Sequence, residues 1–417
     1  MTAQLERAGF SIADTLDEAD CAIVNTCSFI ASATEESIDE IFDILNESTA
    51  RSSDIPVIVS GCMPARYGEE LMNEIPEVAA FLPCKDEGKV VSVVCDALGL
   101  EMLPDESLER NGGQSCETNV FAYVKISDGC DRFCSYCTIP FIRGPYHSFS
   151  FDDICADVDR NVSSGVREIV LIAQDTGRWG EDFDEPATLA DLVSRLAVLY
   201  PETWFRIMYI EPEGVSDALI DAIASHDNIC NYLDIPIQHV DEKILSDMNR
   251  RGSRSSITAL VTRIRERIPD ITLRTTLIVG FPGESAEQFQ ELEDFISEGF
   301  FDLIGIFPFS QEEGTRAAKL PDQIDEDEKI WRANQLRSVA DAVSAAHVAE
   351  TIGHTVSVLI EGSEEDGQLF GRSQAQAPEV DGVTFVDNGT KGDVVPTLIE
   401  DTLLYDMEGS VIVEGDA

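Results

Sequence analysis

Short apolar runs alternate with amphipathic segments along the first hundred residues. Cys21–Cys27 and Ile55–Cys62 are apolar enough to form buried strands, whereas Ser32–Asn46 and Ala65–Asn73 repeat their apolar residues at helical intervals. Strands that alternate with helices are typical of a parallel α/β sheet. We therefore expect a small parallel α/β domain over residues 1–100.

The middle of the chain repeats a strand-then-helix pattern six times over residues 119–341, after a polar linker at 101–118. The predicted strands are Phe121–Ser127, Glu168–Ala173, Trp204–Ile210, Tyr232–Pro236, Thr272–Val279 and Leu303–Phe309. The predicted helices are Phe151–Ser163, Leu189–Leu199, Ser216–Ala224, Glu242–Met248, Ser256–Arg267 and Ala286–Glu298. Eight such units close a complete barrel. Six predict a partial, open (β/α)6 barrel, with its chemistry at the carboxyl ends of the strands.

The last part of the chain, residues 342–417, has a different pattern. A long helix is expected over Glu326–Ala349. Four short alternating segments follow it, separated by turn residues: HTVSVLIEG, QLFGRSQAQ, DGVTFVDN and LLYDMEGSVIVE. This pattern predicts a small five-stranded β-barrel.

Charge sets the chain apart from an average protein. It has 79 acidic and 29 basic residues, a formal net charge of −50 at pH 7, and the excess is spread over its whole length. Such a surface repels phosphate backbones and attracts basic partners. It also serves solubility or adaptation to salt, and the composition alone leaves both interpretations open.

The cysteine content indicates metal ligation. The apolar runs are too short to span a bilayer, and the charged first residues do not form a signal peptide, so we expect a cytoplasmic protein. That compartment keeps thiols reduced, so the 11 cysteines are not expected to form a disulfide framework. Metal ligation is the better explanation for the cysteines that cluster.

The most specific motif is Cys130-x3-Cys134-x2-Cys137, which follows the first predicted barrel strand. Iron–sulfur clusters are normally held by four cysteine thiolates. Three thiolates on one loop would hold three irons of a [4Fe–4S] cluster and leave one iron open for a small molecule. A zinc site would need a fourth ligand, and His147, ten residues farther on, is poorly placed for that role.

This motif, with Tyr136 before its last cysteine, resembles the radical S-adenosylmethionine (SAM) superfamily. The segments CAIVNTCSFI, VSGCMPARY, LDIPIQHVDEKILSDMNRRGS, TLIVGFPGE and FSQEEGTRAAKLPDQ narrow the resemblance to the methylthiotransferases. Within that family the chain is most similar to the branch that modifies an aspartate of ribosomal small-subunit protein twelve. The resemblance implies an N-terminal α/β domain, a radical SAM barrel and a C-terminal TRAM β-barrel.

The resemblance also implies the cofactors and the chemistry. SAM would bind the open iron held with Cys130, Cys134 and Cys137, and Tyr136 would lie against its adenine. One SAM would supply a methyl group to sulfur, and a second would generate the radical that removes hydrogen from the aspartate β-carbon. A reductant such as flavodoxin or ferredoxin would supply the electron.

A second [4Fe–4S] cluster is implied for the N-terminal domain, where Cys27 and Cys62 stand in matching contexts. The family's third cysteine would lie before the first helix, in a segment absent from this sequence, so the second cluster would be incomplete. Cys21 lies about 20 Å from Cys27 along an extended strand, which is too far to replace that ligand. We therefore expect the coding frame to extend upstream of Met1.

Other candidates follow the barrel strands, where barrel enzymes carry their chemistry, and Arg206 lies inside the third strand. Cofactor binding is expected for Gln174, Arg206, Gln238 and Gly280. Weaker candidates are Asp175, Glu211, His239, Gly283 and Glu284. The cysteines without ligand spacing are interpreted as structural or free, and they are Cys84, Cys95, Cys116, Cys155 and Cys230.

Three functions compete: methylthiolation of the ribosomal protein, methylthiolation of tRNA adenosines, and a non-enzymatic iron–sulfur protein. Residues 351–417 hold 14 acidic residues and two basic ones, Arg372 and Lys391. An RNA-binding barrel needs basic contacts to phosphate. This acidic segment instead suits a basic ribosomal protein as substrate and argues against nucleic acid. The complete barrel and the open-iron spacing argue against a simple binding protein.

Overall fold

The computed structural model describes residues 1–49, 55–101 and 119–412, which divide into two compact units. The first unit contains the described residues up to Glu101, together with Cys130–Pro145 and Ser310–Ala318. The second contains residues 119–129, Tyr146–Phe309 and the chain from Lys319 onward. Nearly all of the linker predicted at 101–118 lies outside the described residues.

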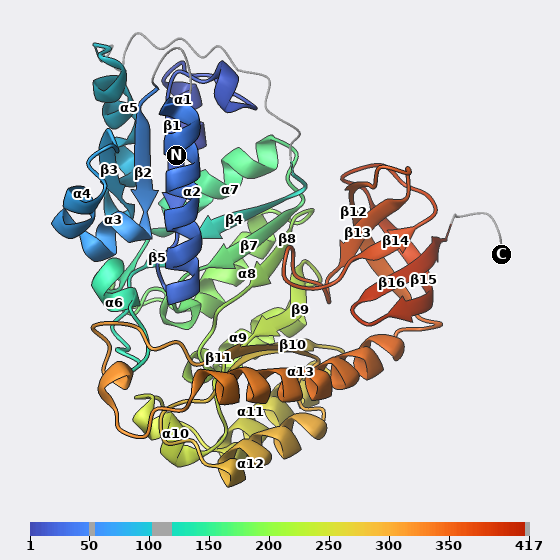
Figure 1. Cartoon of the computed structure of the whole chain (residues 1–417). Coiled ribbons are helices and arrows are strands. Elements are labelled where there is room, and N and C mark those ends of the chain that lie inside the picture. The colour runs from blue at the N-terminus through green and yellow to red at the C-terminus, as the bar shows by residue number, and fades with distance from the viewer. Residues whose placement is uncertain (50–54, 102–118, 413–417) are drawn as a thin grey trace. The chain divides into compact units, whose positions relative to one another are not determined.

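A three-stranded parallel sheet forms the centre of the first unit (Figure 1). Its strands β1 (Ala22–Thr26), β2 (Val57–Gly61) and β3 (Ala80–Pro83) lie side by side in that order. The sequence predicted the first two strands and missed the third, which has only four residues. The predicted parallel α/β domain is confirmed.

Helices cover both faces of this sheet because its strands alternate their side chains between the two faces. Val57 and Val59 pack with α2 (Ala31–Thr49), α3 (Cys62–Tyr67) and α4 (Glu69–Glu74). Ile58 points the other way and packs with α1 (Thr2–Arg7) and α5 (Val90–Leu98). The single helix predicted at 65–73 is two helices, because Gly68 separates them with a positive φ of 54°.

A six-stranded parallel sheet dominates the second unit, in the order β11-β10-β9-β8-β7-β4, and it remains open. Its strands are β4 (Phe121–Lys125), β7 (Glu168–Ile172), β8 (Trp204–Ile207), β9 (Ile229–Asp234), β10 (Thr272–Val279) and β11 (Leu303–Pro308). The predicted partial barrel is therefore confirmed, although β9 begins three residues before its predicted start at Tyr232. A short hairpin, β5 (Ser127–Asp128) with β6 (His147–Ser148), follows β4.

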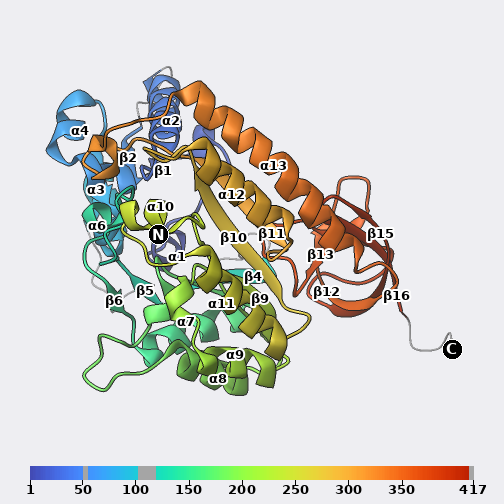
Figure 2. The ribbon, with the colours of Figure 1, turned by 90° about the horizontal axis from the view of Figure 1, so that it is seen from below.

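The barrel helices pack on one face of this sheet (Figure 2) and share one large apolar core with it. They are α7 (Phe151–Ser163), α8 (Leu189–Leu199), α9 (Asp217–Ser225), α10 (Glu242–Asp247), α11 (Arg254–Arg267) and α12 (Ala286–Ser297). Each begins after a Ser, Thr or Asp whose side chain accepts a hydrogen bond from the first turn. The capping residues and the apolar face of each helix are local signals in the sequence. They explain why the bounds of these six helices were predicted within two residues.

The long helix α13 (Glu326–Ala349) leads to a closed five-stranded barrel, which also belongs to the second unit. The barrel strands are β12 (Thr355–Ser363), β13 (Leu369–Ser373), β14 (Thr384–Val386), β15 (Val394–Leu403) and β16 (Asp406–Val411). The sequence predicted the barrel but left most of β15 outside its segments. Among the described helices, none is long and apolar enough to cross a lipid bilayer.

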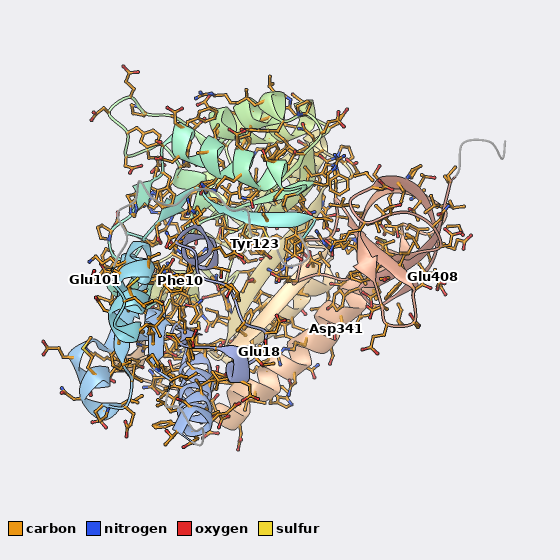
Figure 3. All side chains as sticks on the ribbon, turned by 90° about the horizontal axis from the view of Figure 1, so that it is seen from above. Phe10, Glu18, Glu101, Tyr123, Asp341 and Glu408 are labelled. Carbon is orange, nitrogen blue, oxygen red and sulfur yellow. The ribbon has the colours of Figure 1, made fainter. Side chains whose placement is uncertain are left out.

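Aromatic hydroxyls tie the small barrel to the rest of the second unit. Tyr123 and Asp341, labelled in Figure 3, lie on β4 and α13. The Tyr123 hydroxyl donates to Glu379 at 2.8 Å, and the Tyr405 hydroxyl donates to Asp341 at 2.5 Å. Leu359 and Ala377 pack against barrel residues such as Trp204 and Tyr232, so the two barrels share a buried apolar contact.

Candidate iron–sulfur site

The three-cysteine loop lies between the hairpin strand β5 and a short helix, α6 (Ile139–Ile142). Cys130, Cys134 and Cys137 are all partly exposed. The loop is closed by backbone hydrogen bonds from Cys130 N to Gly144 O (3.1 Å) and from Cys137 N to Cys134 O (3.0 Å). Phe133 takes a positive φ of 50° inside it. These features hold three thiols on one compact turn.

The donor chemistry of this loop suits an iron–sulfur cluster. The Ile139 amide donates to the Cys137 sulfur at 3.4 Å, a contact that favours the thiolate needed for ligation. Within the described ranges no three His, Cys, Asp or Glu side chains meet at a point where they could share one metal ion. A cubane binds each thiolate through a different iron, so its ligands do not need to share such a point.

The second pair of predicted ligands belongs to the same compact unit as this loop. Cys27 directly follows β1, and Cys62 directly follows β2. The two strand ends approach closely because Gly61 has no side chain: a Cβ there would lie 2.4 Å from the Thr26 carbonyl oxygen. The structure therefore brings Cys27 and Cys62 to one edge of the sheet, where ligands bind in open α/β folds.

Three contacts join the cluster loop to this edge of the sheet. The Thr138 hydroxyl donates to the Phe29 carbonyl at 3.3 Å. The Arg143 guanidinium lies 3.7 Å from the Cys62 sulfur, and the Cys84 sulfur lies 3.8 Å from the Ile142 carbonyl oxygen. The segment after Cys137 thus packs on the residues that follow β1, β2 and β3.

A buried glutamate attaches the segment Ser310–Ala318 to the same domain. Glu312 accepts the Ala31 amide at 2.7 Å and pairs with Arg66 at 2.8 Å. Farther along the segment, the Ala317 amide donates to the Ser135 carbonyl of the cluster loop at 2.7 Å. The loop is therefore supported by residues remote in sequence, which periodicity could not reveal.

Cys84, which we interpret from the sequence as structural or free, is buried against Cys62 and Ile142 in one cluster. A hydrogen bond between the two thiols raises the pKa of Cys62, and burial adds to this, whereas Arg143 opposes it.

Cys21 lies at the other end of β1 from Cys27. It packs beside the apolar cluster that contains Leu5 and Ile58. Burial raises the pKa of its thiol to about 11, so it is protonated at neutral pH. Its surroundings are those of a core residue.

In the second unit, polar residues follow the strands as expected. The buried Oε1 of Gln174, which lies just past β7, has no hydrogen-bond partner among the residues described. Gln238, past β9, has a φ of 67°, and its backbone bridges to β10 opposite Leu277. Burial lowers the pKa of the neighbouring His239 to about 4, so this imidazole is neutral at pH 7.

Close packing against α13 leaves no room for a side chain at Gly280. Its φ is 73°, and a Cβ there would lie 2.5 Å from Lys329 Cγ on α13. Its amide donates to the Glu284 carboxyl group, as does that of Phe281. A role for Gly280 in cofactor binding remains a prediction.

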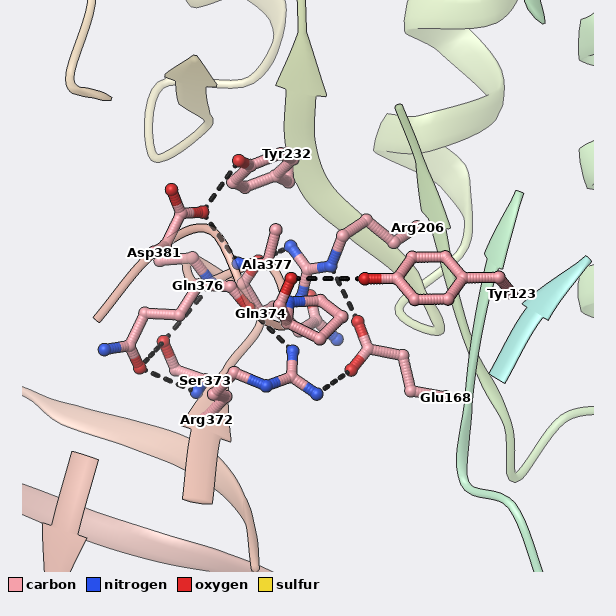
Figure 4. A network of polar contacts seen from close by, with 12 residues as sticks. Tyr123, Glu168, Arg206, Tyr232, Arg372, Ser373, Gln374, Gln376, Ala377 and Asp381 are labelled. Atoms are coloured by element: carbon pink, nitrogen blue, oxygen red, sulfur yellow. Dashed lines mark hydrogen bonds and ion pairs between the residues drawn. The ribbon is translucent and has the colours of Figure 1, made fainter. Parts of the chain in front are cut away.

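The contacts of Arg206 contradict the prediction that this residue binds the cofactor. It is fully buried, and its guanidinium donates to Glu168 at 2.6 Å and to the Gln374 carbonyl oxygen at 2.7 Å (Figure 4). The ring of Tyr232 lies 4.6 Å from its guanidinium carbon. These partners come from the six-stranded partial barrel and the small barrel, so Arg206 holds the two together. The prediction failed because Glu168 and Gln374 are distant in sequence.

Comparison with family models divides the chain into three matches. Residues 124–296 match the radical SAM superfamily, residues 352–412 match the TRAM domain, and residues 1–83 match the uncharacterised protein family UPF0004. The superfamily match implies a [4Fe–4S] cluster and SAM.

Curated relatives match the chain over nearly its whole length. Ribosomal protein uS12 methylthiotransferase RimO of Trichlorobacter lovleyi is 39% identical over 99% of this chain and 94% of its own. The RimO of Syntrophus aciditrophicus is 40% identical over 100% and 95%, and that of Clostridioides difficile is 39% identical over 98% and 94%. The chain belongs to the RimO family.

Solved structures support the fold of this RimO family member. The radical SAM methyltransferase TsrM from Kitasatospora setae, with cobalamin and a [4Fe–4S] cluster bound, has a TM-score of 0.51 at 14% identity. The match covers 69% of this chain and 63% of TsrM. At this identity the likeness concerns the fold alone.

Proposed function

We propose that this RimO family member replaces a β-hydrogen of an aspartate in ribosomal protein uS12 with a methylthio group. The observation that carries the proposal is the three-thiol loop of a radical SAM barrel in a chain that matches the RimO relatives over nearly its whole length. When bound, SAM and a reduced cluster supply the one-electron chemistry needed to break an unactivated C–H bond.

The chain's own residues have distinct tasks in this proposal. Cys130, Cys134 and Cys137 would hold the cluster to which SAM binds, and Tyr136 would lie against the adenine. Gln174 offers a buried acceptor for a polar group of the cofactor. Gln238 is fixed by two backbone hydrogen bonds, to Thr276 O and from Ile278 N, which keep its side chain at the carboxyl end of the sheet.

Cys27 and Cys62 would hold a second cluster, which would supply the sulfur to be transferred. Its placement in the same compact unit as the SAM loop supports this assignment, because transfer requires the two centres to cooperate. Arg143, which follows α6 on the segment after Cys137, contacts the Cys62 sulfur with its guanidinium. The electron comes from a reductant such as flavodoxin or ferredoxin.

The charge of the small barrel supports a protein substrate over tRNA. Arg372 is 1% exposed and is paired with Glu168 and Glu361. Within residues 351–412 this leaves Lys391 as the single exposed Lys or Arg side chain. A surface with so few available cations cannot neutralise an RNA backbone, whereas it attracts a basic protein.

SAM cleavage by the anaerobically reconstituted chain tests the enzyme assignment. The expected products are 5′-deoxyadenosine and methionine, formed by the wild type and absent with Cys134→Ala, because each loop thiolate is one iron's protein ligand. Cys155→Ala, a change of a partly exposed cysteine on α7, is the matched control and retains cleavage. Full cleavage by Cys134→Ala would reject the assignment.

A further inference from the structure

The six-stranded sheet has one face packed on the barrel helices and an opposite face, which we call the open face. Along β10, Leu273 and Leu277 point into the apolar core shared with the helices and are buried. Side chains alternate between the two faces of a strand, so Thr276 and Ile278 lie on the open face, and both are partly exposed. The small barrel packs against another part of this face. Side chains on the remaining part are accessible to a ligand.

Tyr209 lies just beyond the end of β8, at the carboxyl edge of the sheet where barrel enzymes carry their chemistry. Its φ of 59° is in the left-handed region, which is unfavourable for a tyrosine. Hydrogen bonds hold its backbone in this conformation. Its amide donates to the Asp234 carboxylate at 3.3 Å, and its carbonyl oxygen accepts from the Thr176 amide and hydroxyl, both at 3.2 Å. Strained residues held in this way are concentrated at ligand sites.

Glu379 has the same unusual backbone conformation, with a φ of 66°, in the segment that follows β13. Its side chain is exposed, and its Oε2 atom accepts the Tyr123 hydroxyl at 2.8 Å. The same hydroxyl lies 3.3 Å from the Pro378 carbonyl oxygen, so Tyr123 reaches from β4 to the small barrel (Figure 4). Within the described ranges no cation is paired with Glu379. Tyr123 thus fixes a carboxylate whose charge is not neutralised.

The two tyrosine rings lie close to this carboxylate. Burial raises the pKa of Tyr209, and the neighbouring Asp234 and Glu379 carboxylates raise it further, against the effect of Arg274. Burial, the hydrogen bond to Glu379 and the proximity of Tyr209 raise the pKa of Tyr123. The three side chains are therefore near one another, on the face that the small barrel contacts. Each ring is 39% exposed, so part of it remains available to a ligand.

Carboxylates outnumber cations around these rings. Arg274 donates to Asp234 at 3.1 Å and lies 3.5 Å from Asp381, so one guanidinium group is shared by two carboxylates. Glu379 adds a third carboxylate. An incoming anion would be repelled here, whereas a cation would be attracted by the carboxylate and by the aromatic rings. Arg and Lys side chains of a protein substrate provide such a cation.

We propose that Tyr123, Tyr209 and Glu379 bind one Arg or Lys side chain of the protein substrate. The cation pairs with Glu379 and lies against the two rings. The inference rests on the proposed function for the identity of the substrate, and it adds the feature that this site recognises, a basic residue near the modified aspartate. Because Tyr209 lies at the carboxyl edge of the sheet, a residue bound there brings its neighbours to the edge where the reaction takes place.

Equilibrium titration of the reconstituted full chain with uS12 tests the site without turnover. Glu379→Gln removes the charge and keeps the shape, so we expect the Kd for uS12 to rise roughly fivefold. In a panel of uS12 variants, one Arg or Lys near the aspartate at a time is changed to Gln. One of these variants should bind the wild-type chain roughly fivefold more weakly, and Glu379→Gln should not weaken its binding further. Glu408→Gln removes another exposed carboxylate of the small barrel (Figure 3) and should leave the Kd unchanged.

Substitutions of Tyr209 test the aromatic part of the site. Tyr209→Phe keeps the ring and should bind uS12 as tightly as the wild type, whereas Tyr209→Leu should raise the Kd about threefold. Losses that multiply independently for every uS12 variant would overturn the proposal. Equal Kd values for Tyr209→Phe and Tyr209→Leu would also overturn it.

The intact mass of uS12 after a complete reaction reports separately on the proposed function. Methylthiolated uS12 without coupling between Glu379 and any basic residue would overturn this site and leave the function standing. Coupling without methylthiolation would support the site and reject the function. No measurable binding of uS12 by the wild type would overturn both.

Discussion

Arg372 of the small barrel donates a hydrogen bond to Oε2 of Glu168, the first residue of β7, at 2.6 Å. The other carboxylate oxygen of Glu168 accepts from Arg206, also at 2.6 Å. All three side chains are buried. Figure 4 shows the Glu168 carboxylate between the two guanidinium groups. Burial alone would raise the pKa of Glu168, but the two guanidinium groups hold it below its ordinary value.

Removing this carboxylate should destabilise the second unit severely. Glu168→Gln leaves two buried guanidinium groups without their shared anion, which costs about 3–5 kcal/mol in unfolding free energy. Asp86→Asn removes the partner of Lys89 in an exposed pair and should have little effect. Urea unfolding of both variants checks the prediction. Equal stability of the two would show that the network does not hold the barrels together.

Glu284 should make stability fall as pH rises. Burial raises the pKa of Glu284 from 4.5 to about 7, against the opposing effect of Arg332 and the Gly280 and Phe281 amides. Between these two values the folded chain binds more protons than the unfolded chain, so the unfolding free energy decreases as pH increases. The full effect is about 3 kcal/mol.

The measurement compares wild type with Glu284→Gln in urea unfolding from pH 4.5 to pH 7. The unfolding free energy of the variant minus that of the wild type should increase steadily from pH 4.5 to pH 7. Other titrating groups contribute equally to both proteins and cancel. A constant difference over the window would contradict the raised pKa.

Two glycines with the same backbone conformation give a matched test of packing. Gly280 and Gly283 have φ values of 73° and 81°, but a Cβ would meet an obstacle only at Gly280, where it would lie 2.5 Å from Lys329 Cγ. Gly283→Ala should cost about 1 kcal/mol from backbone strain alone. Gly280→Ala should cost about 1–3 kcal/mol more, because the added methyl group displaces α13. Thermal unfolding measures the loss of stability in each variant. Equal losses would contradict the close approach of Gly280 to Lys329.

Charge on the small barrel should control the rate at which the substrate is captured. Glu364 and Glu365 are exposed in the turn between β12 and β13. Their reversal to Lys should slow association with uS12 more than it changes dissociation, as rim charges usually do. Asp184→Lys with Glu185→Lys changes net charge equally at an exposed loop of the other barrel and is the control.

Stopped-flow binding at several salt concentrations measures this effect. Association of the wild type should weaken as the screening length falls from roughly 30 Å at 0.01 M to about 8 Å at physiological ionic strength. The association rate of the variant with Glu364→Lys and Glu365→Lys should depend less on salt than that of the wild type. Binding that is indifferent to salt, or tighter binding of tRNA than of uS12, would favour the tRNA alternative.

The fold could be predicted because its elements carry local signals. β10 alternates buried and partly buried residues over Thr272–Val279, and α13 begins after a capping Asp325, so both were predicted with their observed bounds. β3 was missed because four residues are too few to show a period. β15 was missed because Pro396 and acidic residues interrupt its apolar pattern.

The site was predictable only where its residues are close in sequence. Cys130, Cys134 and Cys137 form a motif that needs no structure to recognise. Cys84 comes beside Cys62 through sheet order, since β3 pairs with β2, and no spacing rule anticipates this. Arg206 was assigned to the cofactor because its partners lie on β7 and after β13, far away along the chain.

The most direct test of the central claim is the intact mass of uS12 after incubation with the reconstituted chain, SAM and a reductant. We expect uS12 to gain one methylthio group in place of one hydrogen, at an aspartate, and its mass to stay unchanged with the Cys134→Ala variant. tRNA in a parallel reaction should remain unmodified. A methylthio group on tRNA adenosine with uS12 unchanged would contradict the account.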